Sequence, residues 1–177
     1  MKTVLLLLAL ALACGAPEER GDAPRAQFEA ALAAGDAAAA LEALADLREG
    51  LPETPESTLA LVRLLIRAGE TNRALWLLEE EALRHPERSD VQVALAETAL
   101  VVGDAARALA ALEHVSAGDA QHAFALLLRS RAELALGDLE GGLATLERGE
   151  ALYPDRFQFH IARIETLVAE ERFEPAL

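Results

Sequence analysis

Histidines, acidic residues and one cysteine are the side chains in this sequence that could bind a metal, transfer a proton or act as a nucleophile. The histidines are His85, His114, His122 and His160, and no two of them have the four-residue spacing of a helical metal site. The motifs HExxH, GxSxG and GxGxxG and the Walker phosphate loop are absent. The acidic run at residues 79–81 is interpreted as a solvated helix face. We therefore predict no catalytic residue, no metal and no cofactor.

Cys14 is the only cysteine, and it directly follows a short apolar stretch. The chain begins with a basic residue at Lys2 and continues with an apolar run over residues 4–12. Crossing a bilayer as a helix requires about 20 apolar residues, so the run has the form of a secretory leader. A plain signal peptide cut after Ala13, with an incidental cysteine, is one interpretation. A lone cysteine in an exported chain has no disulfide partner, which favours a different role.

Residues 10–14, Leu-Ala-Leu-Ala-Cys, resemble the lipobox of bacterial lipoproteins. The resemblance implies a signal peptide at residues 1–13 and a diacylglyceryl group on Cys14, whose two acyl chains suffice for stable anchoring. Gly15 stands where aspartate would signal retention in the inner membrane. We therefore expect a lipid-anchored protein of the bacterial cell envelope that faces the periplasm, with the outer membrane favoured. Residues 14–23 are expected to form a flexible tether.

Composition favours helices and excludes polyanionic partners. Apolar residues make up 53% of the chain and aromatic residues only 4%, with alanine and leucine dominant, which predicts an all-α fold. The formal charge is −14, and Lys2 is the only lysine. Such a charge repels phosphate backbones and anionic headgroups, so nucleic acid is not an expected partner.

A glycine recurs every 34 residues, and an acidic residue follows each one. The four pairs are Gly35-Asp36, Gly69-Glu70, Gly103-Asp104 and Gly137-Asp138. A fixed period of this length is typical of stacked helical hairpins. Each glycine is expected to end one helix in the left-handed conformation, and the next residue, or Thr71 in the second unit, to cap the following helix. The repeats are predicted at residues 24–54, 55–88, 89–119 and 120–154, with a partial fifth at 155–177.

These positions resemble the tetratricopeptide repeat (TPR) over residues 24–177. The matching positions are the turn glycines, a small residue five positions later (Ala40, Ala74, Ala108, Gly142, Ala176), a leucine nine positions later (Leu44, Leu78, Leu112, Leu146), and Pro52, Pro86 and Pro154. The resemblance implies a right-handed α-solenoid of antiparallel helix pairs, about four and a half repeats long. A generic array or bundle of α-hairpins is the alternative.

In the tetratricopeptide family the first helices line a concave groove that binds peptides. The positions that this places in the groove are Leu59, Arg63, Arg67, Val93, Glu97, Leu127, Arg131, Ile161 and Glu165. The series Glu29, Arg63, Glu97, Arg131, Glu165 alternates in sign, which predicts a ladder of ion pairs between neighbouring repeats. In the sharper interpretation, Arg63 and Arg67 form a pair for a carboxylate or an acidic peptide. The asparagines of a carboxylate clamp are absent.

Two further features could contact a partner. Trp76 occupies a position normally on the outer face, where it either folds over its neighbours or contacts a partner or membrane interface. The fifth repeat stops as its second helix begins, which would leave Phe159, Ile164, Leu167 and Val168 uncovered. We therefore expect either a fragment of a longer protein or a partner that completes this end.

The sequence thus predicts a non-enzymatic, lipid-anchored scaffold that presents a helical groove to a peptide or protein partner. The alternative is the N-terminal recognition arm of a longer enzyme, a protease or transferase whose catalytic domain lies beyond residue 177. The partner's identity and the oligomeric state stay open.

Overall fold

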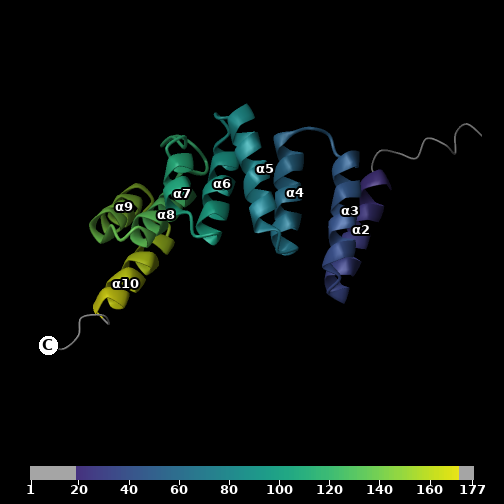
Figure 1. Cartoon of the computed structure of the whole chain (residues 1–177). Coiled ribbons are helices and arrows are strands. Elements are labelled where there is room, and N and C mark those ends of the chain that lie inside the picture. The colour runs from purple at the N-terminus through teal and green to yellow at the C-terminus, as the bar shows by residue number, and fades with distance from the viewer. Residues whose placement is uncertain (1–18, 172–177) are drawn as a thin grey trace, which may run out of the picture. The chain divides into compact units, whose positions relative to one another are not determined.

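The computed structural model describes residues 19–171, and helices are the only regular secondary structure in that range (Figure 1). The chain divides into two units, residues 1–70 and 71–177. The all-α prediction is confirmed. The predicted signal peptide, Cys14 and residues 172–177 lie outside the described residues.

The first unit contains three described helices: α2 (Glu19–Ala34), α3 (Ala37–Gly50) and α4 (Pro55–Arg67). Helix α2 begins five residues before Pro24, where the first hairpin was predicted to start, and Pro24 lies inside it. Phe28 is fully buried, together with Ala40 and Leu44 of α3. Thr54 caps α4, because its hydroxyl accepts a hydrogen bond from the amide of Ser57 at 3.3 Å.

The second unit contains six described helices: α5 (Thr71–Arg84), α6 (Ser89–Val101), α7 (Ala105–Leu112), α8 (His122–Ala135), α9 (Leu139–Leu152) and α10 (Gln158–Glu171). The repeated small and leucine positions are buried as expected, including Ala74, Leu78, Ala108, Leu112 and Leu146. Thr71 is the first residue of α5 rather than the residue before it, so the capping position there falls to Glu70.

The predicted glycine turns are confirmed at all four positions. Gly35, Gly69, Gly103 and Gly137 have φ values between 70° and 84°, a region that side chains with a Cβ avoid. At Gly103 the glycine amide donates to the carbonyl of Leu100 at 3.1 Å, and the amide of Asp104 donates to Ala99 at 2.9 Å; the other three turns repeat both bonds.

The capping aspartates also act as predicted. The side chains of Asp36, Asp104 and Asp138 each accept a hydrogen bond from the amide three residues later, at 2.9 to 3.0 Å. These bonds satisfy one unpaired donor at the start of α3, α7 and α9.

Helix α10 packs against the preceding pair through Phe159. This ring is fully buried in a cluster with Ala123, Leu126 and Leu146, and it stacks on the ring of Tyr153 with centroids 6.2 Å apart. The expectation that Phe159 lacks a cover is therefore wrong. It failed because Gly149 lets α9 approach closely enough to cover the ring: a Cβ at Gly149 would lie 2.2 Å from a ring carbon.

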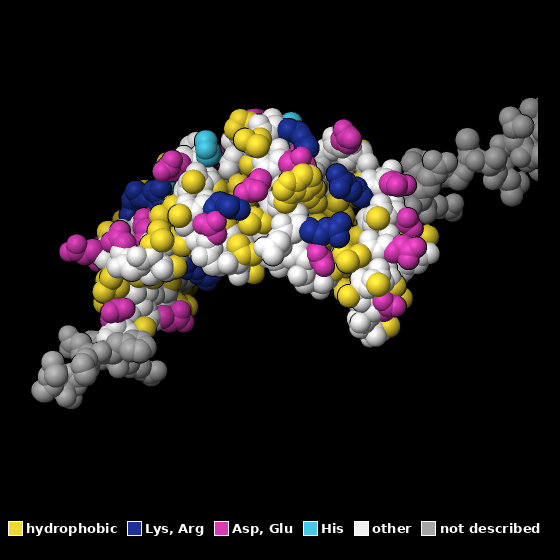
Figure 2. Space-filling model, viewed as in Figure 1, with side chains coloured by type: hydrophobic (Ala, Val, Ile, Leu, Met, Phe, Trp, Pro, Cys, Tyr) yellow, Lys and Arg dark blue, Asp and Glu magenta, His cyan; other side chains and the backbone are white. Residues whose placement is uncertain are grey.

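The acidic run at residues 79–81 is not a uniformly solvated face. Glu81 is only 3% exposed, and its carboxylate lies 3.1 Å from the guanidinium of Arg84. Glu79 pairs with Arg107 of α7 at 2.8 Å, and Glu80 lies 3.4 Å from Arg84. Nearby arginines compensate these charges. On the face shown in Figure 2, acidic side chains are spread out rather than gathered in one patch.

Candidate functional site

In the first unit, Arg67 is held by α2. Its guanidinium donates two hydrogen bonds to the Glu29 carboxylate, at 2.6 and 2.5 Å, and lies 5.7 Å from the centre of the Phe28 ring. These hydrogen bonds lower the pKa of Glu29 and raise that of Arg67. Arg67 is thus already paired with a carboxylate of this chain.

The other two predicted groove residues of the first unit, Arg63 and Leu59, are held by no ion pair among the described residues. Arg63 is exposed and forms no ion pair within the described residues, while Leu59 is half-buried on the same helix. The first pairing of the predicted ladder therefore forms with Arg67 in place of Arg63. The reason is the bidentate geometry and the Phe28 ring, which together hold the guanidinium that lies one turn further along α4.

In the second unit, two predicted groove residues on α6 differ in exposure. Val93 is 5% exposed, so it belongs to the core, and its prediction as an apolar wall is wrong. Glu97 is exposed. Within the described part of the chain, no ion pair joins Glu97, Arg131 and Glu165, so the predicted ladder does not continue through this unit.

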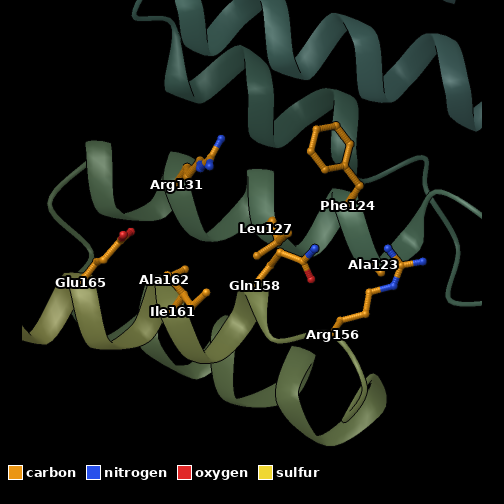
Figure 3. A pocket seen from close by; sticks show the side chains of 9 residues that line it. All are labelled: Ala123, Phe124, Leu127, Arg131, Arg156, Gln158, Ile161, Ala162 and Glu165. Carbon is orange, nitrogen blue, oxygen red and sulfur yellow. The ribbon is translucent and has the colours of Figure 1, made fainter.

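Four other predicted groove residues lie together in one hollow between α8 and α10, with a volume of about 350 Å³ (Figure 3). From α8, Leu127 and Arg131 line it, along with Ala123 and Phe124. These positions recur at helical spacing, so they share one face of α8. Leu127 and Phe124 are half-buried, which leaves apolar surface accessible from the hollow.

The opposite wall comes from α10 and the turn before it. Its lining residues are Arg156, Gln158, Ile161, Ala162 and Glu165. Ile161 is 54% exposed, a large value for an isoleucine that faces a hollow. Figure 3 shows Arg156 at the end marked by Ala123, Leu127 and Gln158 near the middle, and Arg131 and Glu165 towards the other end.

Arg156 is fixed by its backbone, although its side chain is exposed. Its amide donates to the carbonyl of Tyr153 at 2.9 Å, and its own carbonyl accepts from the amide of Phe159 at 3.4 Å. Neither Arg156 nor Arg131 forms an ion pair with any residue in the described range. The hollow therefore contains two unpaired guanidinium groups and one carboxylate around an apolar centre.

The sequence prediction missed Phe124, Arg156 and Gln158. Phe124 lies one turn before Leu127, and extending the groove positions by one turn would have found it. Arg156 lies in a connection between repeats, a segment that the groove positions of the family do not include. Only the folded turn shows that it reaches the end of α8.

Three of the four histidines lie beside a tyrosine or acidic side chains. The Nδ1 atom of His122 lies 2.7 Å from the Tyr153 hydroxyl, and that of His160 lies 2.9 Å from the Glu150 carboxylate. His85 lies near Glu81 and Glu87, and His114 is exposed. Over the described residues, no group of three histidine, cysteine or acidic side chains could hold a metal ion.

Large apolar side chains are also exposed outside the hollow. Trp76 is 53% exposed on α5. On α10, Ile164, Leu167 and Val168 are 60%, 42% and 42% exposed, as predicted, and Phe157, which directly precedes α10, is 71% exposed. No helix within residues 19–171 combines the length and apolar character needed to cross a membrane.

Comparison with known proteins agrees with this architecture. A family model described as tetratricopeptide repeat matches residues 31–98. No curated protein sequence matches the chain.

Solved structures extend the likeness over most of the chain. The MamA structure from Desulfovibrio magneticus RS-1 has a TM-score of 0.64 at 20% identity, with 86% of each chain covered. TTC0263, a thermophilic TPR protein of Thermus thermophilus, has a TM-score of 0.63 at 22% identity, with 89% of this chain and 84% of that chain covered. At these identities the likeness shows the fold, which is that of TPR solenoids.

Proposed function

We propose that this protein is a non-enzymatic scaffold that binds a peptide or protein partner in the hollow between α8 and α10. The observation that carries the proposal is the composition of that hollow, in which exposed Ile161 and half-buried Leu127 and Phe124 lie between unpaired charged groups. Partner sites commonly combine an apolar centre with a polar rim. Grooves between helices commonly bind the apolar face of a peptide segment.

The fold supports the proposal because a stack of helical hairpins presents its first helices side by side over a long surface. The hollow uses two such helices, α8 and α10. Function has to be argued from the site rather than from the fold, and here the site has binding chemistry without a nucleophile or an activated base.

Filling the hollow tests the proposal. The mature protein, residues 14–177, is used to capture partners from envelope extracts, and the Gln158→Trp variant places a large ring among the lining residues without changing charge. Since Gln158 is exposed, the variant is expected to fold normally. A stoichiometric partner is expected with the wild-type protein and at least tenfold less of it with the variant.

The matched control is Ala144→Trp, which puts the same side chain on the exposed surface of α9, at the position that Trp76 occupies in its own repeat. This control should retain the partner. Absence of any stoichiometric partner, or equal capture by both variants, would contradict the proposed site.

We also propose that Cys14 carries a diacylglyceryl group and anchors the protein in the bacterial envelope, facing the periplasm and favouring the outer membrane. The apolar run, the lipobox-like residues 10–14 and the lone cysteine support this proposal. The Cys14→Ser variant should move from the membrane fraction to the soluble periplasmic fraction. Unchanged membrane association in that variant would rule out lipid anchoring through Cys14.

A further inference from the structure

The hollow between α8 and α10 carries a charge opposite to that of the whole protein. Two arginines, Arg131 and Arg156, face one carboxylate, Glu165, in a chain whose formal charge is −14. Each of the three side chains is exposed and forms no ion pair with a described residue. Unpaired guanidinium groups beside apolar surface are suited to a carboxylate ligand.

The two ends of the hollow differ. Arg131 and Glu165 lie towards the same end, so this end presents a donor and an acceptor with little net charge (Figure 3). A guanidinium donates to a peptide carbonyl and a carboxylate accepts from a peptide amide, so this end is suited to an extended backbone. Arg156 lies at the other end, beside the N-terminus of α10, where the helix dipole adds to the positive potential.

The spacing defines what can bind across the hollow. Ala123, near Arg156, and Leu127, near the middle, are four helical positions apart, which corresponds to about 6 Å along α8. In an extended peptide, residues two positions apart are separated by about 6.6 Å, and their side chains point to the same side. A carboxylate on Arg156 therefore places the side chain two positions along over Leu127 and Ile161.

We infer that the hollow selects an extended peptide segment in which an acidic residue precedes or follows a large apolar residue by two positions. The acidic side chain binds Arg156, the apolar side chain contacts Leu127 and Ile161, and the peptide backbone bonds to Arg131 and Glu165. This inference rests on the proposed function and names the chemistry of the partner.

The test uses a displayed library of random heptapeptides, selected against mature wild-type protein. Selected peptides are expected to share an acidic and a large apolar residue two positions apart. The dominant peptide is then measured by fluorescence anisotropy against three variants. Arg156→Glu should weaken its binding at least tenfold and Arg156→Lys by less than fivefold, while Arg73→Glu, an exposed charge reversal on α5, should leave it unchanged.

Charge exchange makes the test specific. A version of the peptide with lysine in place of its acidic residue should bind the Arg156→Glu protein better than it binds wild type. Circular dichroism of each variant confirms that the helices are intact. Selected peptides without the acidic residue, or equal binding to Arg156→Glu, would overturn the inference while leaving partner capture, and so the proposed function, intact.

A second copy of this chain is the competing occupant. Sedimentation velocity over a range of concentrations distinguishes the two, because the peptide inference expects the Gln158→Trp variant and wild type to have the same mass. If wild type forms a dimer and this variant is a monomer, the hollow binds a second copy of the chain, and the peptide inference is overturned.

Discussion

At the scale of single residues, the surroundings of His122 disfavour its charged form. Burial lowers its pKa below the ordinary 6.5, the positive charge of Arg148 adds to the effect, and Asp119 opposes it in part. Its Nδ1 atom is within hydrogen-bond distance of the Tyr153 hydroxyl, in the segment that joins α9 to α10. Protonation of this ring therefore acts against the packing of α8 on the connection.

The first prediction concerns the pH dependence of stability. Between the lowered pKa and 6.5, the unfolded chain binds more protons at His122 than the folded chain does. Stability should therefore be complete above pH 6.5 and decrease as the pH falls below that value. The loss of melting temperature between pH 7.5 and 5.5 should be smaller in His122→Gln than in wild type, as measured by thermal circular dichroism.

His114→Gln is the control, because it removes an exposed imidazole that does not take part in the contact between His122 and Tyr153. The difference in pH profile from wild type should be larger for His122→Gln than for this control. The same pH profile in wild type and His122→Gln would refute the role of burial.

Individual side-chain partners were the least predictable feature. The sequence placed Arg63, Arg67 and Glu29 on first helices, but only the folded chain shows that Arg67 reaches both Glu29 and the Phe28 ring. The prediction that Val93 lines the groove was wrong because α6 is buried on several sides, and the small side chain of Val93 lies in the hydrophobic core. Helical periodicity gives the face of a residue and says little about how deep it lies.

At the scale of helices, the contact of α9 with α10 depends on a missing side chain. Gly149 is buried on α9, and the space that a Cβ would need is filled by the Phe159 ring. A glycine inside a helix costs about 1 kcal/mol relative to alanine. The close approach of the two helices offsets this cost, because it buries the whole Phe159 ring.

The second prediction is that Gly149→Ala destabilises the protein. Forcing a methyl group into a filled contact typically costs about 1–3 kcal/mol, which outweighs the gain in helix propensity. Gly50→Ala is the matched control, because nothing lies within 4 Å of a Cβ at Gly50. Urea unfolding should show a loss for Gly149→Ala and none for Gly50→Ala. Equal effects at the two glycines would show that Phe159 moves aside freely.

Helix boundaries were largely predictable because they depend on local chemistry. Turn glycines and the aspartates after them are visible in the sequence, and they end and begin the helices where expected. The wrong prediction that Phe159 lacks a cover also belongs to the scale of helices. Its burial requires the pairing of Gly149 with an aromatic ring ten residues later, and periodicity does not reveal this pairing.

At the scale of the whole molecule, the excess of acidic residues decides which partners can approach. The chain has 30 acidic and 16 basic residues. Several basic side chains also form ion pairs with acidic residues of the described chain, so fewer of them are left to attract an anionic partner. Long-range attraction to a polyanion requires a basic surface, which this composition does not supply.

The third prediction follows from that charge. A protein of residues 15–177, which lacks Cys14, should show no saturable binding to duplex DNA or to vesicles rich in anionic lipid at about 0.15 M salt. Electrophoretic mobility shift and vesicle co-sedimentation are the measurements, with a strongly basic protein as the positive control. Binding that weakens steeply as salt rises would contradict the prediction.

The fold class was predictable at this scale because one period of 34 residues repeats through the chain, and a stack of hairpins is the structure that such a period specifies. The hollow was only half predictable. Leu127, Arg131, Ile161 and Glu165 occupy repeating positions, whereas Arg156 comes from a connection whose path depends on the packing of Tyr153 and Phe159.

The four glycine turns also make the chain divisible. Because each turn uses the same two backbone bonds and nearly the same φ, one turn can replace another without new chemistry. Removing residues 105–138 would join Asp104 to Leu139 and place its carboxylate three residues before the amide of Gly141, the spacing that Asp138 has now. A 34-residue cassette is therefore the natural step by which such a chain lengthens or shortens, while the side chains on its first helices remain free to diverge.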